Sequence, residues 1–272
     1  MIWDRRKNHF YWTRDPALLV VGWNRGGVGD SSLIDGIVTV VATCAVEVQC
    51  LLGVGPETTH MQNHFSELLA AYLRGLGLDP TDDPVRVARA HGLRIQAFKR
   101  KAGPPRVPTC LGILRGLNPS ELLDVGCGRG TFLWPLVQAF PWLPVTAVDA
   151  LPHRIAVVQA VAAGGIHRLQ GLRTDVTALP FGDDQFDVCT ILEVLEHLED
   201  PAAAAREVVR VARRFVLASV PSKPDDNPEH IQLFTVERLT ELFLSAGARK
   251  VQIQHILNHR IAVVSLEGPC DS

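Results

Sequence analysis

The 272-residue sequence lacks the spacings that a structural zinc site or a redox-active dithiol needs. Its six cysteines form no C-x-x-C pair and no closely spaced zinc pattern. We therefore expect reduced thiols and a cytoplasmic protein, because disulfides persist mainly in oxidising compartments. The cysteines are Cys44, Cys50, Cys110, Cys127, Cys189 and Cys270.

An excess of one charge is also absent. The chain has 27 Lys and Arg against 29 Asp and Glu, a net charge of −2, which predicts no overall attraction to nucleic acid. Aromatic residues make up only 6% of the sequence, whereas the hydrophobic fraction is 47% and the charged fraction 21%. These values are typical of a soluble globular protein with a substantial core. The length allows one large domain, or one domain with a smaller appendage.

Targeting and membrane signals are weak. The N-terminal segment has no apolar stretch behind its charges, so a secretory signal is not predicted. Residues 37–55 are long enough for a membrane span but contain Glu47 and Gln49, and a carboxylate near a bilayer centre costs roughly 2.5–3.5 kcal/mol. We expect a buried strand or strand pair there, with a buried helix as the alternative. The glycine-rich residues 26–30 lack the Lys-Ser/Thr ending of a P-loop and predict a flexible loop.

Composition predicts two regions. Residues 1–107 form an N-terminal region of unknown role that holds helical spacing between Phe65 and Leu73 and ends in a basic, proline-rich connector, residues 94–108. Between Arg94 and Arg106 the connector carries five cations and no acid. Residues 108–272 alternate strand-like and helix-like segments, which is typical of a doubly wound α/β sheet.

The expected elements of the second region are seven strands and four helices. The strands are 121–125, 144–149, 168–173, 186–192, 215–220, 249–256 and 260–267. The helices are 131–140, 151–163, 201–213 and 236–246. Whether residues 193–197 form a further helical turn stays open.

The stretch "ELLDVGCGRG", residues 121–130, places three glycines between the first strand and the following helix. Such a loop puts a ligand at the carboxyl end of the sheet, against a helix N-terminus. A dinucleotide loop would have its third glycine at position 131, which is Thr131 here, so NAD is disfavoured. The next strand ends at Asp149, whose carboxylate could accept two hydrogen bonds from a ribose diol. The pattern predicts a nucleoside-containing ligand.

Further segments follow in a recognisable order. "LLDVGCGRG", "TAVDA", "TDVTALPF", "FDVCTILEVLEHLEDP" and "SVPS" resemble, in order and spacing, the class I S-adenosylmethionine-dependent methyltransferases, and they are most similar to the ubiquinone-type branch (methyltransferase type 11). The resemblance covers roughly residues 108–267. It implies a Rossmann-like, seven-stranded, mostly parallel sheet with an antiparallel last strand, carrying an N-terminal extension of unassigned fold. It also implies S-adenosylmethionine as the cofactor.

The resemblance assigns cofactor roles residue by residue. Three glycines would let the backbone approach the methionine and ribose parts, and the carboxylates would bind the amino group, the ribose and the adenine. The backbone at Leu192 and Glu193 would close over the sulfonium. The implied cofactor-binding residues are Asp124, Gly126, Gly128, Gly130, Asp149, Asp175, Val176 and Glu193.

Two histidines are candidate proton acceptors, because the imidazole pKa lies near neutrality. His197 and His230 both follow strands at the edge where the ligand is expected. If residues 193–197 turn helically, Glu193, Glu196 and His197 share one face. Together with His230 they would suit manganese, iron or cobalt, in a spacing that resembles the metal site of Hen1 small-RNA methyltransferases. The alternative is that Glu196 and His197 only brace the start of the next helix.

The sequence therefore predicts a methyltransferase that methylates an oxygen of a small-molecule acceptor. Two alternatives stay open. One is metal-assisted methylation of an RNA 2′-hydroxyl, since the basic connector could neutralise phosphates. The other is a non-catalytic partner subunit that binds the cofactor without turnover.

Overall fold

The computed structural model describes residues 2–4, 9–11, 64–100, 104–224 and 226–266. The chain divides into two compact units, Met1–Val54 and Gly55–Ser272. In the first unit, strand β1 (Ile2–Asp4) pairs antiparallel with β2 (His9–Tyr11). The predicted loop at 26–30 and the predicted buried segment at 37–55 lie outside the described residues. Among the described residues, none of the helices has the length and apolar character needed to cross a membrane.

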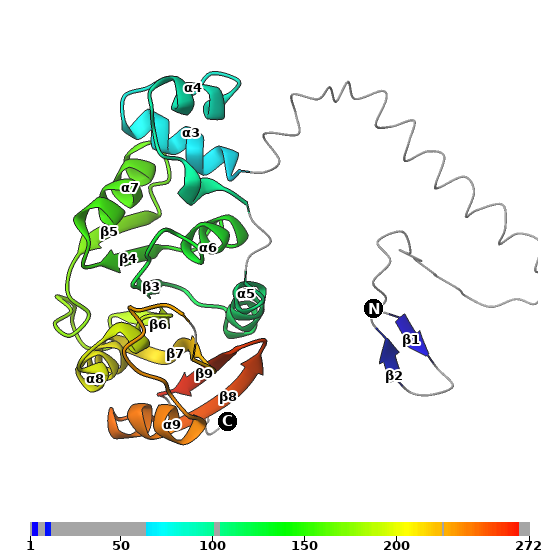
Figure 1. The fold of residues 1–272 in the computed structure, drawn as a ribbon, viewed down its shortest axis with the longest axis vertical. Helices are drawn as coiled ribbons and strands as arrows, with labels where there is room; N and C mark the ends of the chain where they lie inside the picture. Colours follow the sequence, from blue (N-terminus) through cyan, green and yellow to red (C-terminus); the bar gives the residue numbers. More distant parts are fainter. Residues whose placement is uncertain (1, 5–8, 12–63, 101–103, 225, 267–272) are drawn as a thin grey trace, which may run out of the picture. The chain divides into compact units, whose positions relative to one another are not determined.

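The second unit is built on a seven-stranded sheet in the order β5-β4-β3-β6-β7-β9-β8 (Figure 1). Neighbouring strands from β5 to β7 are parallel, and β9 runs antiparallel to both β7 and β8, as predicted. The strands are β3 (Leu122–Val125), β4 (Val145–Asp149), β5 (Leu169–Arg173), β6 (Phe186–Leu192), β7 (Ala212–Pro221), β8 (Lys250–Ile256) and β9 (His259–Ser265).

Nine helical segments accompany the sheet in the described part of this unit. They are α3 (Ser66–Gly75), α4 (Pro84–Ala90), η2 (Gln96–Phe98), α5 (Arg106–Leu117), α6 (Leu133–Ala139), α7 (Pro152–Ala163), η3 (Leu195–His197), α8 (Pro201–Val211) and α9 (Val236–Ser245). The helix predicted over 201–213 is wrong at its end. Its last two residues belong to β7, which begins at Ala212 because that residue pairs with Phe186 of β6.

Both faces of the sheet are buried, because successive strand residues point to opposite sides. Leu122 and Val145 belong to the core shared with α5, α6 and α7, whereas Leu123 and Val148 belong to the core shared with α8 and α9. The sheet is thus covered by helices on two sides (Figure 1). Its carboxyl-terminal edge, where β3, β4 and β6 end, remains available for a site.

Helix α3 packs closely against α7, although it lies upstream of the predicted domain boundary. Leu69 and Leu73 share a core cluster with Val158 of α7. A Cβ atom at Gly164, just after α7, would lie 1.7 Å from the carbonyl oxygen of Ala71, so the two segments meet backbone to backbone. The boundary predicted between residues 107 and 108 therefore does not coincide with the compact unit, because residues 64–98 contribute to its core.

Candidate active site

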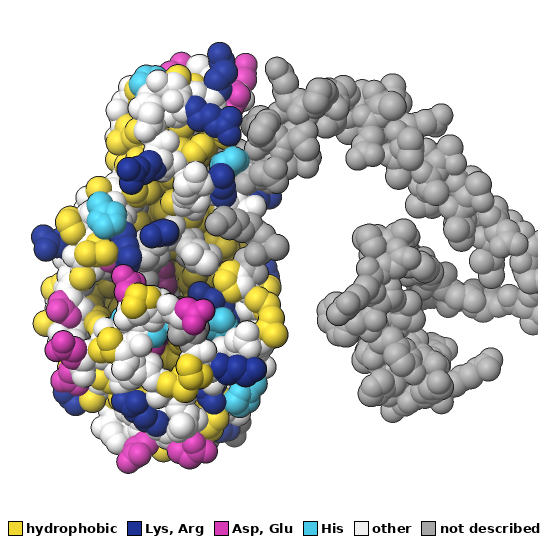
Figure 2. All heavy atoms as spheres, viewed as in Figure 1, with side chains coloured by type: hydrophobic (Ala, Val, Ile, Leu, Met, Phe, Trp, Pro, Cys, Tyr) yellow, Lys and Arg dark blue, Asp and Glu magenta, His cyan; other side chains and the backbone are white. Residues whose placement is uncertain are grey.

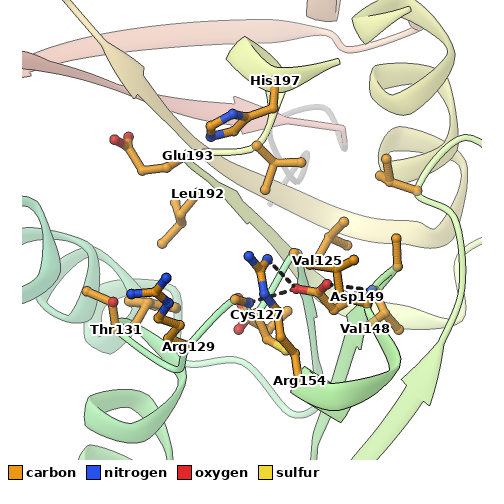
Figure 3. Close-up of a pocket in the computed structure, with 18 of the residues that line it drawn as sticks. Val125, Cys127, Arg129, Thr131, Val148, Asp149, Arg154, Leu192, Glu193 and His197 are labelled. Carbon is orange, nitrogen blue, oxygen red and sulfur yellow. Dashed lines mark hydrogen bonds and ion pairs between the residues drawn. The ribbon is translucent and has the colours of Figure 1, made fainter. Parts of the chain in front are cut away.

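A cavity of about 830 Å³ lies at the carboxyl ends of β3, β4 and β6. Figure 3 shows Asp149 and Arg154 on one side of it and Glu193 and His197 on another. Most of the residues that the sequence predicts for the site line this cavity; Gly130 and Glu196 are not among its lining residues. Those that line it are Asp124, Gly126, Gly128, Asp149, Asp175, Val176, Glu193, His197 and His230.

The reason for having a glycine differs among the three positions of the loop. All have positive φ, at 72°, 56° and 82° for Gly126, Gly128 and Gly130. A Cβ at Gly126 would lie 2.3 Å from Cγ2 of Val194, and one at Gly130 would lie 2.0 Å from Nε1 of Trp134. A Cβ at Gly128 would meet nothing closer than 3.8 Å. Protein packing therefore explains the glycines at 126 and 130, whereas Gly128 leaves open space beside the cavity.

Asp149 is buried at the end of β4 and held by three donors. Its Oδ2 accepts hydrogen bonds from the Gly128 N–H at 2.9 Å and from Nη1 of Arg154 at 3.2 Å. Its Oδ1 accepts from the Leu151 N–H at 2.9 Å. Oδ2 therefore uses both of its lone pairs, whereas Oδ1 keeps one, so the group can still accept a hydrogen bond from a ligand.

Asp124 is a buried carboxylate with one satisfied and one unsatisfied oxygen. Thr190 Oγ1 donates to its Oδ1 at 2.7 Å, while Oδ2 is buried without a hydrogen-bond partner among the described residues. Burial raises the pKa of Asp124 to about 7, with the Thr190 hydrogen bond opposing and the charge of Asp149 adding to the rise. Because Asp124 lines the cavity, a cationic ligand group could satisfy the remaining oxygen.

Asp175 follows β5 and is held by the next turn. Its Oδ1 accepts from the Thr177 N–H at 2.9 Å and from the Thr177 hydroxyl at 2.8 Å. These hydrogen bonds lower the pKa of Asp175, so the carboxylate is ionised at neutral pH. Asp175 and Val176 both line the cavity, as the prediction for the adenine end requires.

The helical turn considered for residues 193–197 does not form as a unit. Glu193 has φ of 58°, in the left-handed region, and only Leu195–His197 form the 3₁₀ helix η3. This reversal breaks the spacing that would have placed Glu193 on the same face as Glu196 and His197. The predicted four-residue metal set is therefore corrected: Glu193 is not part of the group that converges.

The carboxylate of Glu193 has other partners. Its Oε1 accepts a hydrogen bond from the Ser219 hydroxyl at 2.8 Å and lies 3.7 Å from Nε of Arg106. Its Oε2 lies 3.0 Å from Nε2 of His259, the first residue of β9. The side chain thus joins the ends of β6, β7 and β9 beside the cavity.

Glu196, His197 and His230 do converge. One potential ligand atom from each lies within 4.8 Å of the others, and the two imidazole centroids are 4.8 Å apart. Glu196 is buried, while the two histidines are half-buried and line the cavity. Nδ1 of His197 lies 2.9 Å from the carbonyl oxygen of Glu229, so Nδ1 must carry the proton. In the neutral imidazole, Nε2 is then left with a lone pair.

The cysteine in the glycine loop is not suited to nucleophilic chemistry. Burial raises the pKa of Cys127 far above its usual range, and the charges of Asp124 and Asp149 raise it further. The thiolate is the reactive form of cysteine, so this thiol is inert at neutral pH. Cys110, Cys127 and Cys189, the three cysteines of the described region, are all buried free thiols.

Sequence reasoning missed several lining residues with polar side chains. Arg154 lies in the first turn of α7 after Asp149, and that closeness in sequence could have indicated the ion pair. Arg106 was counted only as a charge of the connector. The residues missed are Arg106, Arg129, Arg154, Asn227 and Glu229.

The site therefore combines two kinds of chemistry in one cavity. The carboxylates at the ends of β3, β4 and β5 are suited to a cationic, hydroxyl-rich nucleoside. The histidines after β6 are suited to hold or accept a proton.

Comparison with known proteins agrees with this arrangement. Residues 123–215 match the family model described as a methyltransferase domain. That segment contains the glycine loop, Asp149, Asp175 and His197, and it ends before His230.

Two curated relatives match parts of the chain. The demethylmenaquinone methyltransferase of Roseiflexus castenholzii is 38% identical over 96 residues, which cover 34% of this chain and 37% of the relative. The ubiquinone biosynthesis O-methyltransferase of Methylocella silvestris is 35% identical over 124 residues, which cover 46% of this chain and 46% of the relative. The chain thus spans less than half the length of these relatives.

Among solved structures, the methyltransferase domain of a bacterial Hen1 protein superposes with a TM-score of 0.51 at 18% identity. The match covers 60% of this chain and 98% of that domain. At this identity the likeness shows a shared fold.

Proposed function

We propose that this chain, whose residues 123–215 belong to the methyltransferase domain family, transfers a methyl group from S-adenosylmethionine to an oxygen of a small-molecule acceptor. One observation carries the proposal: a single cavity joins the glycine loop and Asp149 to Glu193 and His197. Relatives named for demethylmenaquinone and for ubiquinone O-methylation support the acceptor class. They give no support to an RNA acceptor.

The cofactor fits the residues that are present. The open space at Gly128 admits a ligand close to the backbone, and the unsatisfied Oδ2 of Asp124 would receive a cationic amino group. Asp149 would accept a hydrogen bond from a ribose hydroxyl at Oδ1, and Asp175 with Val176 would hold the adenine. When bound, S-adenosylmethionine supplies a methyl group that its sulfonium has already activated.

The protein's own task is then to position the acceptor and remove its proton. His197 donates from Nδ1 to the Glu229 carbonyl, which orients the ring and leaves Nε2 to take the proton of an acceptor hydroxyl. The cavity walls would hold that hydroxyl near the cofactor and limit water. A positioned base of this kind contributes about 10²- to 10⁴-fold to the rate.

A methyl-transfer assay with labelled S-adenosylmethionine and a panel of phenols and catechols tests the proposal. We expect turnover with at least one acceptor, and a loss of about 10²-fold or more in His197→Gln because the base is absent. The matched control is His255→Gln, an exposed histidine on β8 that does not line the cavity. Transfer to RNA alone, or cofactor binding without turnover on any acceptor, would contradict the proposal.

A second role for the histidines is favoured by the convergence of Glu196, His197 and His230. One carboxylate and two imidazoles suit manganese, iron or cobalt, with the remaining positions open to other ligands. Titration with Mn²⁺ followed by calorimetry tests this role. Binding that is lost in His230→Gln supports a metal site, whereas equal binding to both proteins rules it out.

A further inference from the structure

A second cavity of about 420 Å³ lies behind the glycine loop. It is formed by the segment after α4, by the loop itself and by the facing sides of α6 and α7. Its size is within the range that accommodates small organic ligands. The lining residues that matter here are Arg94, Arg129, Trp134, His153, Arg154 and Val157. We call it the basic cavity.

The charge of the basic cavity is of one sign. Three arginines and a histidine line it, and no carboxylate is among its lining residues. Within the described part of the chain, neither Arg94 nor Arg129 forms an ion pair or hydrogen bond, and both are exposed at the cavity mouth. Figure 2 shows Lys and Arg side chains on both halves of this face, several of them around the hydrophobic side chains of the upper half. Such a concave, positive surface attracts anions.

The wall of the basic cavity is aromatic and rigid. Trp134 is 2% exposed and stacks on Phe98, with ring centroids 5.2 Å apart and planes inclined by 24°. The side chains of Val157 and Ala97 add apolar surface. Because Trp134 is almost fully buried, a ligand can meet only its edge, and the half-buried Ala97 and Val157 supply the apolar contact surface. Arginines at the mouth can pair with carboxylate or phosphate oxygens.

We propose that the basic cavity binds a planar aromatic molecule that carries a phosphate or carboxylate group. This ligand is distinct from the cofactor and the methyl acceptor. The aromatic part would lie against Ala97 and Val157, at the edge of Trp134, and the anionic group would meet Arg94, Arg129 and His153.

Arg154 links this cavity to the active site. It lines both cavities, and its Nη1 donates to the same Oδ2 of Asp149 that accepts the Gly128 N–H. An anion that draws the guanidinium away leaves Oδ2 more available to a ligand in the large cavity. Occupancy of the basic cavity therefore increases the affinity of the large cavity, and reciprocity requires the same factor in both directions.

Calorimetry with 1-naphthyl phosphate and 1-naphthoic acid as probes tests the proposal on the full chain. We expect at least one probe to bind, and Arg94→Gln/His153→Gln to weaken it about tenfold or more. Neither substituted residue lines the large cavity, so the affinity for S-adenosylhomocysteine should stay within about twofold. The control Arg86→Gln/Arg206→Gln removes two exposed arginines elsewhere and should leave probe binding unchanged.

Comparison of the probe affinities identifies the anionic group of the ligand. Tighter binding of the phosphate identifies a phosphate ester, and tighter binding of the naphthoate identifies a carboxylate. Equal binding of uncharged 2-naphthol, or no probe binding at millimolar concentration, would overturn the proposal. Competition with S-adenosylhomocysteine that is insensitive to Arg94→Gln/His153→Gln would place the probe in the large cavity and would also overturn it.

The coupling between the two cavities is measured separately, as the effect of the probe on the affinity for S-adenosylhomocysteine. Saturating probe should tighten binding of S-adenosylhomocysteine about fivefold or more, and this effect should vanish in Arg154→Gln. An unchanged affinity in the unsubstituted protein would refute the link through Arg154.

Discussion

Nε2 of His259 lies 3.0 Å from Oε2 of Glu193, which ties the start of β9 to the end of β6. The hydroxyl of Ser219 holds the other oxygen at 2.8 Å. Glu193 needs this support because its backbone has φ of 58°, and a non-glycine residue in the left-handed region costs on the order of 1–3 kcal/mol. These contacts make His259 a positioning residue for the segment that would face the reacting methyl group.

His259→Ala should therefore impair methyl transfer without unfolding the protein. The substitution removes the ion-pair contact with Glu193 and the 3.3 Å hydrogen bond between Nη1 of Arg106 and Nε2 of His259. A hydrogen bond to a charged group contributes about 1.5–3 kcal/mol, which corresponds to a decrease of about 10- to 100-fold in kcat/KM. His255→Ala removes an exposed histidine from the neighbouring strand and should leave kcat/KM unchanged. Equal kinetics in both variants would show that Glu193 does not depend on His259.

Two glycine substitutions should separate folding from ligand binding. Gly130→Ala places a Cβ against Trp134 and should lower the free energy of unfolding by about 2–5 kcal/mol, from overpacking together with left-handed backbone strain. Gly128→Ala meets open space and carries only the strain, about 1–2 kcal/mol, but its methyl group extends toward the cavity. Chemical denaturation and calorimetry with S-adenosylhomocysteine measure the two effects.

We expect Gly130→Ala to lose more unfolding free energy than Gly128→Ala. Relative to its smaller loss of unfolding free energy, Gly128→Ala should lose more affinity for S-adenosylhomocysteine. If Gly128→Ala binds S-adenosylhomocysteine as tightly as the unsubstituted protein, the ligand does not approach that part of the loop.

Asp124 gives a pH-dependent prediction. Its pKa in the folded protein is about 7, above the ordinary value of 3.8, because burial disfavours the charged form. Between about pH 4 and pH 7 the folded protein keeps a proton that the unfolded chain has released, so stability falls as the pH rises and is lowest above pH 7. Asp124→Asn avoids this loss.

At pH 8, Asp124→Asn should therefore be more stable than the unsubstituted protein by up to about 4 kcal/mol of unfolding free energy, which raises its melting temperature. The difference should shrink toward pH 5. Thermal denaturation without ligand at the two pH values measures it. A difference that is the same at both values would mean that the Asp124 carboxyl is not held protonated by folding.

Much of the sheet could be predicted from the sequence, because strands buried on both faces read as short apolar runs such as 186–192. The ends of β3 and β4 were placed correctly, and so Asp124 and Asp149 were found as site candidates. The observed topology confirms the predicted doubly wound sheet, and residues 123–215 match the methyltransferase domain family. The role of each site residue stays a prediction.

Other features depend on contacts that spacing does not encode. Nothing local to "EVLEH" predicts that Glu193 would take a left-handed conformation and turn toward Ser219 and His259. The packing of α3 on α7 was also missed, because the close backbone contact between Ala71 and Gly164 joins segments that are distant in the sequence. The predicted boundary at 107 and 108 was drawn from composition, which does not report shared cores.

The central claim is that Asp149 holds the ribose of S-adenosylmethionine in the cavity beside Gly128. Calorimetric titration of S-adenosylhomocysteine into the unsubstituted protein and into Asp149→Asn tests it most directly, with Glu199→Gln as an exposed acidic control. We predict saturable binding that weakens about 10- to 100-fold in Asp149→Asn, since hydrogen bonds to a charged group contribute about 1.5–3 kcal/mol, and that is unchanged in the control. Absence of binding to the unsubstituted protein, or equal affinity in Asp149→Asn, would contradict the account.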